Sequence, residues 1–338
     1  MFKRYLFVSC FIAAIAGGAY GYDAAPYGEN IFLLGFPRFV SSAASTTGGG
    51  LYDAGPYSIN INPALTAPLQ RVAVDLGGTM LLTKDDGGTA FHAGALVPSR
   101  WGVWTGDFDA SFIPVPLSPP GHAISAHFGW ARDIVENLYV GVSIFAGGVF
   151  KYGNDFALGF DAGFVYKLGK LGFLKDARAS AVFAGIGKTF TNDVYKNFPG
   201  MFTPKGGFAA VLYESGKFAA GFSVDLAVPS FQNAVLGVGL DFNVFKIIDI
   251  SAGWDMNIRE LADKRGAHTP FVGITVRLTK NTSSSDILMK RGWDKTDINI
   301  YGVYQRLNDE INLFSAGASA HFGAIDRSPP VIEMGEAE

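Results

Sequence analysis

The sequence predicts an all-β protein: a transmembrane antiparallel up-and-down β-barrel of about 14 strands with an N-terminal hatch in its lumen. Three observations predict this class: an export signal at the N-terminus, long runs of alternating apolar and polar residues, and an apolar composition that disfavours helices. Hydrophobic residues make up 49% of the chain and charged residues only 17%, against about 25% charged in soluble domains. The 43 glycines disfavour helix interiors, so strands are expected to carry the apolar surface.

Residues 1–21 are predicted to be a cleavable signal peptide. Lys3 and Arg4 form a positive segment, and residues 5–16 form an apolar run. Small residues at Ala19 and Gly21 suit the −3 and −1 positions, so cleavage is expected before residue 22. The apolar run is shorter than the roughly 20 residues that a spanning helix needs.

A short N-terminal membrane anchor and a lipoprotein acylated at Cys10 are the alternatives for this segment. Cys10 is the only cysteine of the chain and lies within the predicted signal peptide. The mature chain is therefore expected to lack disulfides, thiol nucleophiles and Cys-ligated metals.

Residues 22–69 do not alternate and are predicted to form a hatch, or plug. An apolar patch at 31–40 is followed by a run of small residues at 41–50 and then by Pro and Gly punctuation. A segment of this length is short for a periplasmic domain with its own core. Because larger barrels are often plugged, we expect the segment to fold into the lumen.

Residues 70–322 are predicted to form the barrel, because their apolar residues alternate with small or polar ones. Between residues 155 and 168 one face is apolar and aromatic, whereas the other is small or charged. The same pattern recurs at 217–228 and 247–258. These runs exceed the average strand of about 5 or 6 residues in soluble domains and suit a tilted strand that crosses a bilayer. The mid-strand charges Asp161, Asp225 and Asp255 all fall on the polar face, which would line the lumen.

Fourteen such segments follow one another, an even number as expected for a bacterial single-chain barrel. Counts of 12 or 16 stay open, because the boundaries of predicted strands are uncertain by about two to four residues. The expected strands are 70–82, 89–98, 101–112, 122–130, 137–150, 155–168, 178–189, 205–212, 217–228, 233–244, 247–258, 268–279, 296–306 and 310–322.

The final 16 positions, residues 323–338, are predicted to be a flexible tail, because they are polar and interrupted by Pro329-Pro330. No segment of the mature chain offers 18 consecutive apolar residues, so helical membrane spans are not predicted. Signal peptide and barrel together place the protein in the outer membrane. Outer-membrane lipid and the barrel-assembly machinery are its expected partners, and the net charge of −3 gives no footprint for nucleic acid.

Three short motifs in the hatch segment are similar to the hatch of the FadL/TodX family. They are Leu34-Gly35-Phe36-Pro37-Arg38, then Gly50-Leu51-Tyr52-Asp53-Ala54-Gly55, then Asn62-Pro63-Ala64-Leu65. The family's hatch carries an Asn-Pro-Ala motif just ahead of its first strand, which is where this sequence has one. The resemblance is at motif level over residues 34–80. It implies an outer-membrane transporter of long-chain fatty acids or other hydrophobic compounds, in which the hatch shifts and the ligand leaves sideways through the barrel wall.

The resemblance also suggests site residues. Asn62, Pro63, Ala64 and Leu65 would form the hatch motif, with Pro63 fixing φ in a rigid turn. The candidate apolar ligand contacts are Phe32, Leu34, Phe36 and Phe39. Packing of the hatch against the wall is the alternative role for these four residues. Arg38 and Arg71 are the candidate cations for a fatty-acid carboxylate, although arginines usually pair with nearby acids.

Two other functions stay open: a general diffusion porin, and a structural or secretion-associated barrel that binds a partner protein. Enzyme activity is not predicted, and neither a cofactor nor a metal is expected. The five histidines are scattered, and Ser125 and His127, two apart on one strand, form a pairing that is common by chance. The glycine run at 48–50 lacks the Lys-Ser/Thr that a phosphate loop requires.

Overall fold

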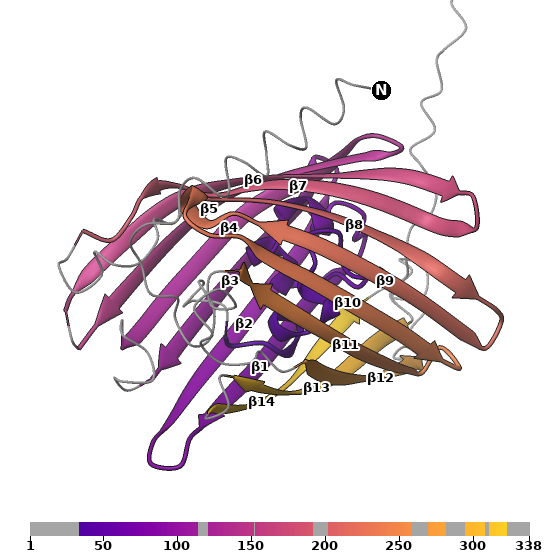
Figure 1. Ribbon diagram of the computed structural model, residues 1–338. Coiled ribbons are helices and arrows are strands. Elements are labelled where there is room, and N and C mark those ends of the chain that lie inside the picture. Colours follow the sequence, from indigo (N-terminus) through magenta and orange to yellow (C-terminus); the bar gives the residue numbers. More distant parts are fainter. Residues whose placement is uncertain are drawn as a thin grey trace, which may run out of the picture.

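The computed structural model describes residues 34–113, 121–151, 153–191, 202–258, 270–281, 295–307 and 311–322. The predicted signal peptide, the C-terminal tail and Phe32 lie outside the described residues. Within them, the chain forms a barrel with a coiled N-terminal segment in its interior (Figure 1).

The barrel is a closed antiparallel sheet of 14 strands in which each strand pairs with its neighbours in sequence. The first strand pairs with the last, from Val72 opposite Phe322 to Leu82 opposite Asn312. The predicted fold class and strand number are confirmed. The strands are β1 (Val72–Leu82), β2 (Gly87–Ser99), β3 (Gly102–Phe112), β4 (His122–Val135), β5 (Leu138–Phe150), β6 (Asp155–Leu171), β7 (Leu174–Lys188), β8 (Thr203–Glu214), β9 (Phe218–Ala227), β10 (Val235–Val244), β11 (Ile248–Asn257), β12 (Phe271–Asn281), β13 (Lys295–Leu307) and β14 (Ile311–Phe322).

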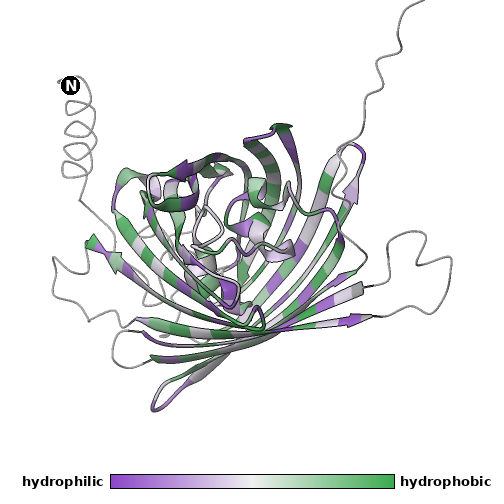
Figure 2. Ribbon diagram, turned by 90° about the vertical axis from the view of Figure 1, so that its right-hand side faces the viewer, coloured by the Kyte–Doolittle hydropathy of each residue, from purple (hydrophilic) through white to green (hydrophobic). Residues whose placement is uncertain are grey.

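Apolar and polar residues alternate along the strands, as the stripes in Figure 2 show. The apolar side chains lie on the outer surface. On β6, Phe156 and Leu158 are about half exposed, whereas Asp161 between the outward residues is buried. A surface of exposed Leu, Ile and Phe would be unfavourable in water but suits lipid. No helix within the described ranges is long and apolar enough to cross a bilayer. The chain therefore has the architecture of an outer-membrane barrel, as predicted.

The two ends of the barrel differ. β1 begins and β14 ends at the same end, and five tight turns lie there too, between β2 and β3, β4 and β5, β6 and β7, β8 and β9, and β10 and β11. Short turns face the periplasm in bacterial barrels. We call this the inner end and the opposite one the outer end.

Residues 34–69, which we call the hatch, lie inside the barrel (Figures 1 and 2). They form four short 3-10 turns, η1 (Pro37–Val40), η2 (Ser42–Ala44), η3 (Pro56–Asn60) and η4 (Pro63–Thr66). Three of these turns begin with proline, whose fixed φ suits the first position of a helical turn and which has no N–H to satisfy there. A fifth turn, η5 (Pro229–Phe231), connects β9 to β10. The predicted domain boundaries, including residues 22–33 of the hatch, stay a prediction.

Candidate functional site

The hatch touches the barrel wall where the wall carries glycine. A Cβ added to Gly141 of β5 would overlap the backbone of Pro63 and Ala64. A Cβ added to Gly163 of β6 would overlap the side chain of Asn62. The Asn-Pro-Ala-Leu turn therefore docks against a strip of wall that has no side chains in the way.

Asn62 holds this turn together from a fully buried position. Its Oδ1 accepts a hydrogen bond from the Ala64 backbone N–H at 3.0 Å, which caps η4. Its Nδ2 donates to the Thr46 carbonyl at 2.7 Å, and so ties η4 to an earlier part of the hatch. Leu65 is equally buried. The structure thus brings the four predicted motif residues together, and their role in transport stays a prediction.

Lumen-facing aspartates of the wall hold the hatch backbone. Each accepts a hydrogen bond from a backbone N–H that no strand or helix partner satisfies. Such a bond to a carboxylate is stronger than one between neutral groups. The three bonds join Tyr57 to Asp75 (2.8 Å), Thr46 to Asp225 (2.8 Å) and Gly50 to Asp241 (2.7 Å).

Arg178 of β7 anchors the glycine run of the hatch. Its guanidinium donates to the carbonyls of Gly49 at 2.7 Å and Gly50 at 3.1 Å. It also pairs with Asp176 at 2.9 Å and lies over the ring of Tyr52. This arginine thus donates hydrogen bonds to carbonyls of a loop that forms neither helix nor strand.

Aromatic side chains of the hatch pack against one another and against the wall. Phe36 stacks on Tyr57, with ring centroids 5.1 Å apart, and meets Tyr301 of β13 edge-on at 5.4 Å. Phe39 contacts Phe36 at 6.2 Å. In this conformation Phe36 and Phe39 fill space between hatch and wall, so a role in ligand binding stays a prediction.

Both predicted cations have acidic partners. Arg38, which is buried, pairs with the partly buried Asp53 of the hatch. Burial alone would raise the pKa of the Asp53 carboxyl, but Arg38, helped by Arg277, outweighs it and holds the pKa below its usual value. Arg71, just ahead of β1, pairs with Asp297 of β13.

A second apolar region lies at the outer end of the lumen. Leu81 of β1 and Leu313 of β14 are fully buried there, although they point into the barrel, where a water-filled channel would be polar. We call this region the outer apolar cluster. Its members are Leu34, Leu81, Ala90, Ile113, Ala123, Phe145, Val149, Ala157, Ile311 and Leu313. Leu34, a predicted ligand contact, is its hatch member.

A cavity of about 410 Å³ lies at the inner end, between the hatch residue Leu51 and the wall. Its rim is formed by the turns of β6–β7, β8–β9 and β10–β11 and carries both basic and acidic side chains, including Lys217 and Glu214. The cavity is therefore a polar mouth on the periplasmic side of the hatch.

The Ser125–His127 pair does not form a catalytic arrangement. Neither the Ser125 hydroxyl nor the His127 Nδ1 makes a hydrogen bond in the described part of the chain. His127 Nδ1 instead lies 3.2 Å from a carboxylate oxygen of Asp107. A nucleophile activated by a hydrogen-bonded base is thus not formed by these two residues.

Sequence reasoning missed the wall residues of the site. Arg178, the hatch-binding aspartates and the inward-facing leucines belong to strands that were read only as lipid-facing and lumen-facing sets. One signal was present: Leu81 and Leu313 break the pattern by placing a large apolar residue on the face that otherwise carries small and polar ones. Such breaks mark where the lumen face of the wall is apolar.

No protein-family model matches the chain, and no curated protein matches it. Solved structures share its fold. A TodX deltaS2S3 mutant monoaromatic hydrocarbon channel aligns with a TM-score of 0.51 and 11% identity, over 86% of this chain and 99% of that one. The CymD monoaromatic hydrocarbon channel aligns with a TM-score of 0.50 and 11% identity, over 87% and 98%.

A Pseudomonas aeruginosa FadL homologue aligns with a TM-score of 0.50 and 10% identity, over 90% of this chain and all of that one. At such low identity the likeness establishes the fold alone. The resemblance to FadL/TodX-type barrels that the hatch motifs indicated is confirmed at that level.

Proposed function

We propose that this chain carries hydrophobic small molecules, such as long-chain fatty acids or aromatic hydrocarbons, across the outer membrane. The observation that carries the proposal is the outer apolar cluster, a group of buried apolar side chains on the lumen side of the barrel wall. The names of two structures that share the fold, monoaromatic hydrocarbon channels, support the same substrate class.

The outer apolar cluster lies where a ligand from outside would first meet the hatch. Burying apolar surface is favourable by about 25 cal/mol per Å². In a water-filled pore, Leu81 and Leu313 would expose apolar surface to water without benefit. An apolar ligand would gain favourable contact with them. Phe145 and Leu34 bring wall and hatch into the same cluster, so a ligand bound there would contact the part that has to move.

The packed hatch distinguishes this proposal from the two alternatives. A general diffusion porin needs a continuous aqueous path, but Tyr57, Asn62 and Leu65 of the hatch are fully buried inside this barrel. A secretion-associated barrel would need a partner protein, whereas the outer apolar cluster suits a small apolar ligand. A carrier whose hatch shifts when ligand binds accounts for both the plug and the apolar lining.

Ligand recognition is expected to rest on apolar contact rather than on an ion pair. A fatty-acid carboxylate would meet Arg38 already paired with Asp53, and Arg71 already paired with Asp297. Exchanging one ion pair for a similar one brings little net gain. Neutral hydrocarbons should therefore compete with fatty acids for the site.

The direct test is binding of cis-parinaric acid, a fluorescent fatty acid, to the refolded barrel, with toluene as competitor. Leu81→Ala removes lumen-facing carbons and is expected to weaken binding by about 1–2 kcal/mol, or about 5- to 30-fold. Its matched control is Leu82→Ala, which alters the neighbouring lipid-facing side chain. Absence of saturable binding, or equal binding by both variants, would refute the proposed site.

We place the sideways exit at an irregularity of the wall between β6 and β7. The strand register shifts between Phe160 and Ala162, and Gly185 opposite adopts a left-handed φ of 70°. Such a bulge interrupts the ladder of hydrogen bonds. Phe145 of the outer apolar cluster lies against Gly159 beside it, so the cluster reaches the weak point of the wall.

Cross-linking tests this exit. Cysteines replacing the paired residues Ala162 and Phe183 would lock β6 to β7 beside the bulge, and cysteines replacing Val74 and Ala95 would lock β1 to β2 as the control. Only the first disulfide should slow ligand release, and a reductant should restore it. Unchanged release with full cross-linking would exclude this exit while leaving ligand binding unaffected.

A further inference from the structure

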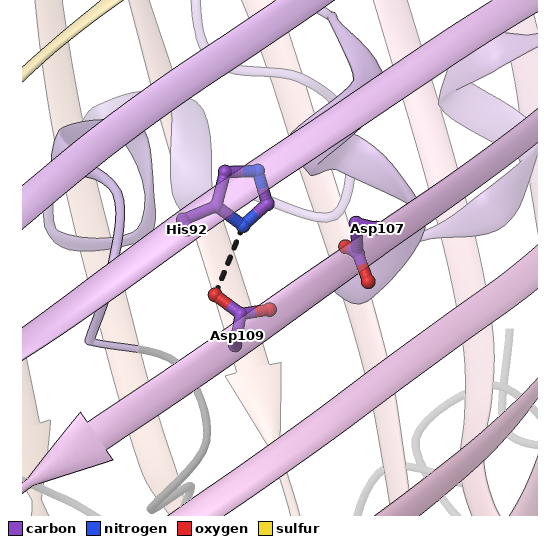
Figure 3. Close-up of side chains that lie close together, drawn as sticks. All are labelled: His92, Asp107 and Asp109. Atoms are coloured by element: carbon purple, nitrogen blue, oxygen red, sulfur yellow. Dashed lines mark hydrogen bonds and ion pairs between the residues drawn. The ribbon is translucent and has the colours of Figure 1, made fainter.

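A cluster of buried imidazole and carboxylate groups lies on the lumen side of β2 and β3. His92 is the cross-strand neighbour of Asp109, and Asp107 lies two positions earlier on the same face of β3. The three residues are buried, and one ligand atom of each lies within 4.8 Å of the others. Figure 3 shows the three side chains converging from the two strands.

The imidazole of His92 is held by a carboxylate on each side. Nε2 lies 3.0 Å from Asp75 Oδ1, and Nδ1 lies 2.9 Å from Asp109 Oδ1. In the tautomer that donates from Nε2 to Asp75, the lone pair of Nδ1 faces Asp109. Either a proton on Nδ1, which makes the ring an imidazolium that donates to both carboxylates, or a metal ion in place of that proton satisfies this contact. A carboxylate that orients a histidine in this way is the usual outer partner of a metal-binding imidazole.

Two buried oxygens beside the cluster have no hydrogen-bond partner within the described ranges. Asn60, at the end of η3 in the hatch, donates through Nδ2 to Asp107 and, at 3.3 Å, to Asp109, yet its own Oδ1 is unsatisfied. The Ser125 hydroxyl, cross-strand from Asp109, is also unsatisfied. Both side chains are at least nine-tenths buried. Because the two amide positions of an Asn are interchangeable by a half turn, Asn60 can present its oxygen to the carboxylates, an arrangement that a bound cation would stabilise.

The charges of the cluster also favour a cation. Asp75, Asp107 and Asp109 place three carboxylates in a buried region, where the imidazoles of His92 and His127 lie against them. Buried charges are costly unless they are paired or bind a metal. A metal on His92, Asp107 and Asp109 would compensate this excess.

We propose that His92, Asp107 and Asp109 form a binding site for a divalent transition-metal cation at the seam between hatch and wall. One imidazole with hard oxygen donors suits Mn²⁺, Fe²⁺ or Zn²⁺ better than an all-oxygen ion such as Ca²⁺ or a thiolate-seeking ion such as Cu⁺. Asn60 would supply a ligand from the hatch, so the metal would fasten η3 to β3.

The test uses Mn²⁺ as the probe and the full-length, tag-free barrel in detergent, after treatment with chelator and dialysis. Loss of the EPR signal of aqueous Mn²⁺ on titration reports binding, and coupling to an imidazole nitrogen in pulsed EPR reports the histidine ligand. We expect saturable binding of a single Mn²⁺, displaced by Zn²⁺, with nitrogen coupling in the wild type. We also expect a higher thermal midpoint in the loaded protein.

Asp75→Asn removes the outer hydrogen-bond partner of His92 and should weaken Mn²⁺ binding by about 10- to 100-fold. Asp109→Asn removes a proposed ligand and should weaken binding at least as much. The matched control is Asp225→Asn, which alters another lumen-facing, hatch-binding carboxylate away from the cluster. Heat-modifiable mobility in gels verifies that each variant is folded. If a variant does not fold, the nitrogen coupling of the wild type decides. Wild-type protein that leaves the aqueous signal intact, or binds Mn²⁺ without nitrogen coupling, overturns the proposal, as does equal binding by Asp109→Asn and Asp225→Asn.

Discussion

Replacing Asn62 by alanine should loosen the hatch without damaging the barrel. The substitution removes the cap of η4 and leaves the Thr46 carbonyl and the Ala64 N–H buried without their partner. A lost N-cap costs about 1 kcal/mol, and an unsatisfied buried polar group costs about 1–3 kcal/mol. The capping bond and the unsatisfied Ala64 N–H describe the same loss and are counted once, so we expect the docked hatch to be destabilised by about 3 kcal/mol in total. The open hatch should then be about 100-fold more populated.

Hydrogen exchange measured by mass spectrometry follows this opening directly. Peptides that cover residues 45–66 should exchange about 100-fold faster in Asn62→Ala, whereas peptides from the strands should keep their protection. Asn312→Ala is the control, because Asn312 lies at the outer end of β14 and its side chain bonds only to the Tyr304 hydroxyl among the described contacts. Wild-type exchange rates in the hatch of Asn62→Ala would refute the role given to this side chain.

The remaining predictions concern a glycine of the wall and the effect of low pH on the hatch. Gly163→Ala should displace Asn62 and destabilise the docked hatch by about 2 kcal/mol, within the range for overpacking. The control is Gly206→Ala, whose added methyl group meets only ordinary van der Waals contact. Hydrogen exchange of the hatch distinguishes the two variants, and similar rates in both would contradict the docking. Because the pKa of Asp53 is lowered in the folded state, its pair with Arg38 stabilises the hatch above the ordinary carboxyl pKa of about 4 and is lost as the pH falls through the lowered value. Hatch exchange should therefore gain an acid-dependent phase that Asp53→Asn lacks, and a phase that persists in this variant would assign it to other groups.

The barrel could be predicted from sequence because a strand that separates lipid from lumen alternates over its whole length. Asp161 illustrates the principle: it was expected to face the lumen, and it lies there, bonded to Ser143 at 3.0 Å and to the Gly185 N–H at 2.6 Å. The number of strands followed from the number of alternating runs. Strand ends were less accurate, as for β7, which begins at Leu174 rather than 178, because turns at the inner end extend the ladder without a change in pattern.

The contacts between hatch and wall could not be predicted from sequence. Arg178 binds the carbonyls of Gly49 and Gly50, which lie about 130 positions earlier, and no local pattern links them. Phe36 was expected to be a ligand contact because it is a hatch aromatic, but a buried ring between Tyr57 and Tyr301 looks the same in sequence. Roles of this kind depend on which inward-facing side chains meet after the barrel closes.

The central claim is that the barrel moves hydrophobic molecules. Its most direct test is the initial rate of radiolabelled oleate uptake, with toluene as competitor, by cells that express the chain but lack other barrels for hydrophobic compounds. We predict saturable uptake well above that of the empty vector, lowered by Leu81→Ala and not by Leu82→Ala. Uptake equal to the vector control, with the folded barrel present in the outer membrane, would contradict the claim.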